Sequence, residues 1–179
     1  EGKEKYHFNP DDGAVFETDD GGWIYVSNSE SNNGGVGALR FDSDGHLINY
    51  NMILKGTTRN CSGGKTPDNT WLSCEEYING KVWECDPFMK KKSRSHPAMG
   101  IFSHESASVD PDTNIIYLTE DDNNGLFYRY LPEGKLQAAC KDYNNVVWTD
   151  VNPNKLPVKN QVKNGLRNHK WEGCVYHPD

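Results

Sequence analysis

The chain has 179 residues, and its 19 lysines and arginines against 26 aspartates and glutamates give a formal net charge of −7. An acidic balance argues against nucleic acid as the main partner, and the lack of any long apolar run excludes a membrane-spanning helix. Five tryptophans and nine tyrosines are too many for a disordered chain. The composition therefore predicts a folded unit with a modest apolar core.

Short alternating segments, separated by turn sequences, predict an all-β fold. No segment has helical periodicity, whereas apolar and polar residues alternate in many short runs. Clusters of glycine, asparagine, aspartate and proline between these runs are typical of hairpin turns. In chain order, we expect strands at 23–26, 38–41, 71–72, 81–83, 115–118 and 126–130, and turns at 19–22, 44–45, 79–80 and 111–114.

Three of these segments repeat at a constant interval. Residues 24–30, 70–76 and 116–122 align without gaps at a step of 46 residues, and a second strand follows each of them. Repeats of this length, built from several short strands, are typical of β-propeller blades. We therefore expect residues 1–179 to form a single partial β-propeller domain, with blade repeats of about 46 residues and about four blades' worth of sequence.

A second, shorter repeat lies just before copies of the first one along the chain. Together they predict a cluster of side chains at one rim of the propeller. Residues 105–111 match 172–178, and 61–67 fit the same frame. In an antiparallel hairpin the start of the first strand lies beside the end of the second, and the innermost strands of a propeller line its central channel. We therefore expect eight side chains to converge on the axis: Glu30, Cys61, Glu75, Glu76, Glu105, Asp121, Asp122 and Glu172.

Such a cluster requires cations, because carboxylates a few ångströms apart raise one another's pKa. Carboxylate oxygens suit Ca²⁺, whereas the thiolate of Cys61 favours a transition metal in addition. The sequence therefore predicts a metal site able to bind a phosphate, polarise it and activate a nucleophile. For any single carboxylate the alternative is a solvated turn residue, but recurrence in register argues against that for the set.

Cys74 and Cys85 flank the Asn79-Gly80 turn symmetrically. If that turn has two residues, the cysteines face each other across the hairpin and could form a disulfide.

In the segments that carry the candidate metal ligands, the chain resembles the PhoX-type alkaline phosphatases. The resemblance spans about residues 12–178 and implies a six-bladed propeller, completed in the same or another chain, with an axial site. In that site iron (Fe³⁺) would be bridged by a cysteine, beside several Ca²⁺ ions. Family membership would also imply a secreted phosphomonoesterase, extracellular or periplasmic. The matching stretches are 60–67, 70–76, 104–107, 121–122 and 171–173, while 28–30 is similar to that family's Asn-His-Glu segment.

The resemblance also implies roles for single residues. Cys61 would be the iron-bridging thiolate. Tyr77 stands where the family usually has Asn, and Lys170 where it usually has Arg, and both positions are expected to contact phosphate. Lysine keeps the charge of arginine but lacks its planar fork. The candidate carboxylate ligands would be Glu30, Glu76, Glu105, Asp122 and Glu172.

These observations lead to different classes of function. The first is a metal-dependent phosphomonoesterase similar to alkaline phosphatase, or a segment of one, acting on phosphate monoesters with Lys170 and Tyr77 as catalytic residues. The second is a non-catalytic extracellular metal-binding or structural propeller protein, which the departures at Tyr77 and Lys170 favour. A calcium-dependent propeller hydrolase of another specificity, such as a lactonase, is a third, and it would not need Cys61.

Overall fold

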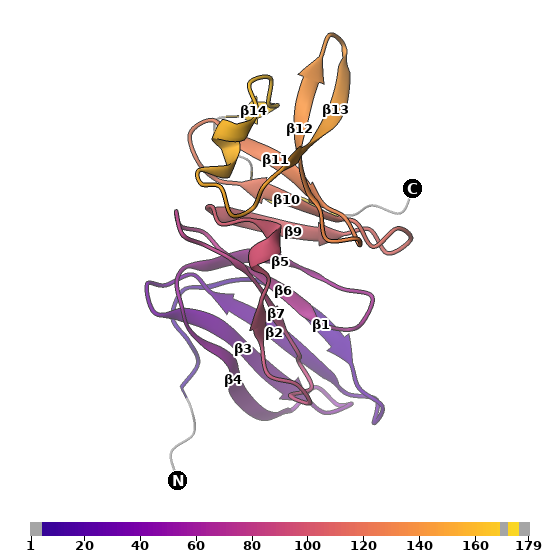
Figure 1. Ribbon diagram of the computed structural model, residues 1–179. Coiled ribbons are helices and arrows are strands. Elements are labelled where there is room, and N and C mark those ends of the chain that lie inside the picture. Colours follow the sequence, from indigo (N-terminus) through magenta and orange to yellow (C-terminus); the bar gives the residue numbers. More distant parts are fainter. Residues whose placement is uncertain (1–4, 169–171, 176–179) are drawn as a thin grey trace.

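The computed structural model describes residues 5–168 and 172–175, and these residues form antiparallel sheets with almost no helix. Three sheets follow one another along the chain and fan out from a shared edge (Figure 1). Two 3-10 turns, η1 (Pro97–Met99) and η2 (Val158–Gln161), complete the regular structure of this part of the chain. The expectation of an all-β fold is confirmed. Within the described residues, no helix has the length and apolar character that a membrane span requires.

Each sheet is a meander in which strands that are consecutive in the sequence pair with each other, as in a propeller blade. The first sheet contains β1 (Pro10–Glu17), β2 (Trp23–Ser29), β3 (Gly34–Phe41) and β4 (Leu47–Thr57). The second contains β5 (Asn60–Lys65), β6 (Trp71–Glu75), β7 (Val82–Cys85) and β8 (Arg94–Ser95). The third contains β9 (His104–Val109), β10 (Ile116–Glu120), β11 (Gly125–Tyr130), β12 (Leu136–Asp142) and β13 (Asn145–Val151), and β14 (Arg167–Asn168) pairs with β11.

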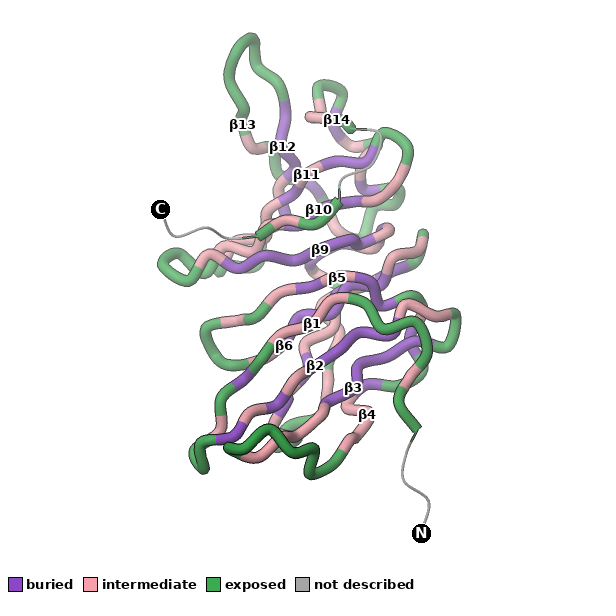
Figure 2. Tube along the Cα trace, turned by 180° about the vertical axis from the view of Figure 1, so that it is seen from behind, coloured by how far each residue is buried: buried purple, intermediate pink, exposed green. Residues whose placement is uncertain are grey.

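The first strands of the three sheets, β1, β5 and β9, lie side by side at the shared edge (Figure 2). β5 and β9 approach each other closely at Gly64, where an added Cβ would lie 1.8 Å from the carbonyl oxygen of Ala107. Only glycine fits at such a distance, because any side chain would collide with the neighbouring backbone. Gly64 thus lets the inner strands β5 and β9 lie close together.

Apolar side chains fill the two wedges between neighbouring sheets. The alternation of β2 directs Ile24 and Val26 into the first wedge, where they meet Trp71 of the second sheet. Leu72 and Val82 leave the other face of the second sheet and pack with Leu118 and Tyr128 of the third. Fully burying such side chains stabilises a fold by about 1.5–3 kcal/mol each. Each sheet is thus held by its neighbours.

The fourth repeat is represented in the described chain by residues 172–175, which form no strand. This segment lies against the third sheet, since the Ser106 hydroxyl donates to the Cys174 carbonyl (3.3 Å) and the Cys174 thiol donates to the Tyr117 carbonyl (3.6 Å). It therefore lies against β9 and β10 of that sheet.

Cys74 and Cys85 do not form the disulfide that a two-residue turn would allow, and both are free and buried. Cys74 pairs with Val82 and Cys85 pairs with Trp71, so the turn between β6 and β7 is wider than two residues. The register therefore differs from a two-residue hairpin by an odd number of positions, which turns the two thiols to opposite faces. Each of them packs in a different wedge.

Asn28 is a buried polar joint between the first and second sheets. Its Nδ2 donates to the carbonyls of Cys61 (2.7 Å) and Ser62 (3.0 Å). Its Oδ1 accepts from Trp71 Nε1 (2.9 Å) and from Ser73 Oγ (2.8 Å). Every hydrogen-bonding position of the amide is therefore used, and all four bonds cross from one sheet to the other.

We expect Asn28→Ala to lower the free energy of unfolding by about 2–4 kcal/mol, because it leaves buried carbonyls and an indole N–H without partners. Urea unfolding followed by circular dichroism measures the loss. The matched control is Asn49→Ala on β4, where the side chain is exposed, and it should change stability by less than about 0.5 kcal/mol. Equal effects of the two substitutions would contradict the role of Asn28.

Candidate metal centre

A β-bulge interrupts each inner strand at the same place. Strand pairing shifts between Pro10 and Gly13 in β1 and between Asn60 and Gly63 in β5. It shifts again in β9, just after His104. A bulge re-aims the side chains at the point where it occurs. The residues that open the three bulges are Asp11, Cys61 and Glu105.

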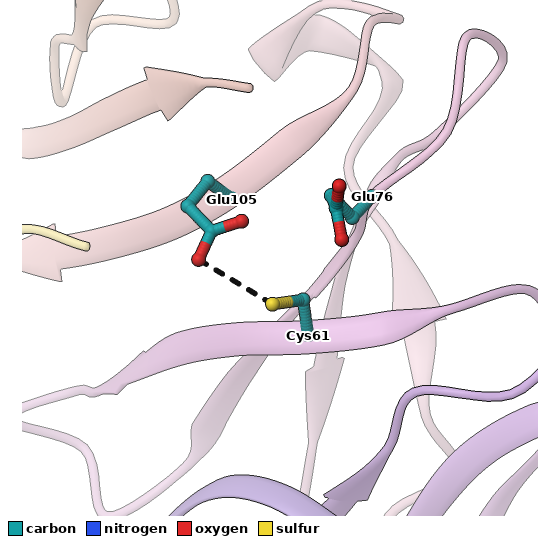
Figure 3. Close-up of side chains that lie close together, drawn as sticks. All are labelled: Cys61, Glu76 and Glu105. Carbon is teal, nitrogen blue, oxygen red and sulfur yellow. Dashed lines mark hydrogen bonds between the residues drawn. The ribbon is translucent and has the colours of Figure 1, made fainter. Parts of the chain in front are cut away.

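The three bulges bring their side chains together. Cys61 Sγ lies 3.4 Å from Glu105 Oε1, a hydrogen bond that Figure 3 shows between neighbouring strands. The same thiol lies 3.8 Å from Asp11 Oδ2, in the first sheet. Both Cys61 and Glu105 are buried. Three separate sheets thus deliver one donor group each to the axis.

A second ring of carboxylates follows the ends of β2, β6 and β10. The backbone N–H groups of Glu30, Glu76 and Asp121 make equivalent hydrogen bonds, each to the carbonyl of the residue one position before the inner strand of its own sheet. These three residues are therefore structural counterparts. The loops that carry them, with residues 58–59 between the first two sheets, form one end of the sheets, which we call the axial rim: 30–33, 58–59, 76–81 and 121–124.

Glu76 completes a group of potential ligands with Cys61 and Glu105. One donor atom from each of these residues lies within 4.8 Å of the other two, and the three side chains face one another in Figure 3. A sulfur and two carboxylates at such distances suit a cation. Cys61 and Glu105 come from inner strands and Glu76 from the axial rim, so the structure brings together these three of the eight expected side chains.

The proton affinities of the group reflect crowding of like charges. Burial raises the pKa of Glu76 to about 8, assisted by hydrogen bonding to Asp121 and by the charge of Glu105. Burial likewise raises the pKa of Glu105 to about 7; the hydrogen bond from Cys61 opposes this, and the charges of Glu172 and Asp121 add to it. Burial and the charge of Glu105 also raise the pKa of the Cys61 thiol far above its usual range. Without a cation, these groups therefore keep their protons to a higher pH than isolated side chains do.

Asp11 was missed in the sequence, although a signal for it exists. Pro10-Asp11-Asp12-Gly13 has the same spacing to its glycine as Asn60-Cys61-Ser62-Gly63. The second bulge residues also correspond, since Ser62 Oγ donates to Asp12 Oδ2 (2.6 Å). Extending the shorter repeat backwards by one blade would have identified Asp11.

The structure directs Glu75 away from the cluster. Its carboxylate accepts hydrogen bonds from Trp83 Nε1 (2.9 Å), from the Lys81 N–H (3.2 Å) and from the Thr58 N–H (2.9 Å). Glu120 does the same in the third sheet, where it accepts from the Leu126 N–H and from the Tyr128 hydroxyl, both at 2.9 Å. Both glutamates therefore close the hairpins of their own sheets.

Asp122 is likewise engaged elsewhere. Its carboxylate lies 2.6 Å from Lys159 Nζ. The gapless repeat aligned Asp122 with Glu76, but the backbone hydrogen bonds align Asp121 with it. Asp121 follows Glu76 by 45 positions instead of 46, so it takes the position that the sequence frame assigns to Asp122.

Two of the remaining expected residues, Glu172 and Tyr77, lie at the margin of the site. Glu172 is exposed, yet its charge contributes to the raised pKa of Glu105. Tyr77 is half-buried next to Glu76 on the axial rim, and burial raises the pKa of its phenol, with the charge of Glu75 acting in the same direction. Lys170 lies outside the described residues.

Comparisons with known proteins identify a family and a similar fold. A family model described as "Alkaline phosphatase PhoX" matches residues 33–91 and 79–150, which together make up more than half of the chain. A search of curated protein sequences finds no significant match.

A solved structure has a similar fold: Pseudomonas fluorescens PhoX in complex with vanadate, a transition state analogue. The TM-score is 0.69 at 15% sequence identity, and the match covers 82% of this chain and 49% of that chain. The present chain thus spans about half the length of that structure. The likeness confirms the expected β-propeller fold.

The raised pKa values of Glu76 and Glu105 predict how the metal-free chain responds to pH. A carboxyl whose pKa is higher in the folded state stabilises the fold at low pH, and this stability is lost as the pH rises through the folded-state pKa. We therefore expect these two groups to lower the melting temperature of the chelator-treated chain between about pH 5 and about pH 8.

The substitution Glu76→Gln imitates the protonated carboxyl, so it should reduce this loss by a few degrees. Glu133→Gln, which removes an exposed carboxylate at the opposite rim, is the matched control. Thermal melts of both variants over this pH range provide the measurement. A slope that Glu76→Gln leaves unchanged would contradict the crowding of charges at the axis.

Proposed function

Because this chain belongs to the PhoX family of alkaline phosphatases, we propose that it carries the axial metal site of a metal-dependent phosphomonoesterase. The observation that supports this proposal most directly is the group formed by Cys61, Glu76 and Glu105. The second sheet supplies Cys61 and Glu76 and the third supplies Glu105, and burial and like charges raise the pKa values of all three groups, which a bound cation would lower. We further propose that residues 1–179 act as one partial propeller domain.

The donor set fits both kinds of ion that the family implies. Cys61 supplies a thiolate, a ligand preferred by transition metals, and would hold Fe³⁺ together with Glu76 and Glu105. The surrounding carboxylates of Asp11, Glu30 and Asp121 supply hard oxygen donors, which suit Ca²⁺. When bound, such cations act as Lewis acids that stabilise the negative charge developing on a phosphoryl group.

The chain's own residues would then bind and orient the substrate. The half-buried Tyr77 stands beside Glu76, where its hydroxyl could donate a hydrogen bond to a phosphate oxygen. Its raised pKa keeps this hydroxyl protonated at alkaline pH. We retain Lys170 as a second phosphate contact. Together they would supply donors to a dianion that the carboxylates alone would repel.

The remaining blades would complete the ring and supply further ligands. The chain spans about half the length of the similar PhoX structure, and its three sheets surround the axis on one side (Figure 1). We propose that these blades belong to the same or to another chain. Secretion, to the periplasm or outside the cell, stays a prediction.

A chelator experiment tests the proposed function. We expect the chain, loaded with Ca²⁺ and Fe³⁺, to release phosphate from an aryl phosphate monoester and to lose this activity when a chelator removes the ions. Cys61→Ser should lower the iron content by at least about tenfold, since a hydroxyl is a much poorer ligand for a transition metal than a thiolate.

The control Cys140→Ser removes another buried thiol, in β12, and should keep both iron and activity. Iron retention without phosphate release would favour the non-catalytic metal-binding protein instead. Calcium binding without iron would contradict the role of Cys61.

A further inference from the structure

Arg59 lies on the axial rim between two loops that carry potential ligands. Its backbone N–H donates to the Ser31 carbonyl (2.7 Å), and its carbonyl accepts from the Glu76 N–H (2.8 Å). Cys61 follows it by two positions in the chain, so their Cα atoms lie at most about 7.6 Å apart. The long side chain of Arg59 therefore starts at the mouth of the candidate metal centre.

The backbone at this position gives no reason for an arginine. Arg59 has a φ of 46°, in the left-handed region that long side chains rarely adopt. The equivalent residue of the first sheet is Asn9, with a φ of 44°, and its carbonyl accepts from the Glu30 N–H (2.9 Å). Asparagine adopts this conformation more easily. An arginine that occupies a strained position points to a role for its side chain.

Arg59 is also an uncommitted positive charge at an acidic site. Its side chain is exposed and makes no ion pair or hydrogen bond with any residue that the structure describes. Two other basic residues near this rim are engaged. Lys159 pairs with Asp122, and the guanidinium of Arg167 donates to the carbonyls of Asn124, Lys159 and Val162.

We propose that Arg59 binds the phosphate group of the substrate at the mouth of the metal centre. This inference rests on the proposed phosphomonoesterase function. A phosphate monoester must approach past carboxylates that repel it, and a guanidinium offers two parallel N–H donors that match two phosphate oxygens. Arg59 would thus attract the dianion and orient it.

The test replaces the side chain without disturbing the backbone. Arg59→Asn places at this position the residue that the first sheet uses in the same conformation. In the metal-loaded chain, we expect it to raise the KM for an aryl phosphate and the Kd for vanadate by on the order of tenfold to a hundredfold. Arg59→Lys keeps the charge but not the fork, so its loss should be smaller.

Metal content and melting temperature should stay unchanged in both variants. Lys135→Ala, which removes an exposed positive charge at the opposite rim, is the control and should leave KM and Kd unchanged.

The outcomes separate this inference from the proposed function. Normal KM and Kd in Arg59→Asn, or a loss of bound metal in that variant, would overturn the role of Arg59 and leave the phosphatase standing. A metal-loaded wild-type chain that neither hydrolyses the ester nor binds vanadate would overturn both. Vanadate binding that depends on Arg59, without turnover, would support Arg59 as an oxyanion contact and contradict catalysis.

Discussion

Repulsion between carboxylates gathered at one axis is the constraint on which this structure depends. Burial and neighbouring charges raise the pKa values of Glu76 and Glu105, so the fold favours a protonated or a metal-bound cluster over bare anions. The inter-sheet cores and the buried amide of Asn28 hold the sheets in place against this repulsion. Because cations relieve the same repulsion, metal binding and folding are linked.

The sequence was sufficient for the fold because its signals are local. Alternating strands and turn residues depend only on neighbouring residues and predicted the hairpins, while the 46-residue step is visible along the chain and predicted the propeller. The expected convergence of Cys61, Glu76 and Glu105 rested on strand direction in the hairpins and on the place of the inner strands in a propeller. What was missed depends on register. A one-residue difference in the third repeat exchanged Asp121 for Asp122, and a wider turn separated Cys74 from Cys85.

The sequence also did not predict which partners each side chain contacts. Glu75 and Glu76 are identical in type and adjacent, yet one closes its hairpin through Trp83 and the other reaches the cluster. Neighbouring residues at a strand end point to opposite sides, and which side faces the axis is set by packing with other sheets. Asp11 is the opposite case. Its place in the shorter repeat could be recognised in the sequence, but its position at the axis depends on the bulge of β1.

β1, β5 and β9 share a bulge at which the ligand residue can change with little effect on the stability of the sheet. Its first position holds an aspartate, a cysteine and a glutamate in turn, without any change in the strand pairing around it. Residues there contribute little to the ladder, since a bulged residue is left unpaired. In evolution, single substitutions at this position could therefore exchange soft sulfur for hard oxygen ligands and so change the preferred metal, while the surrounding architecture is conserved.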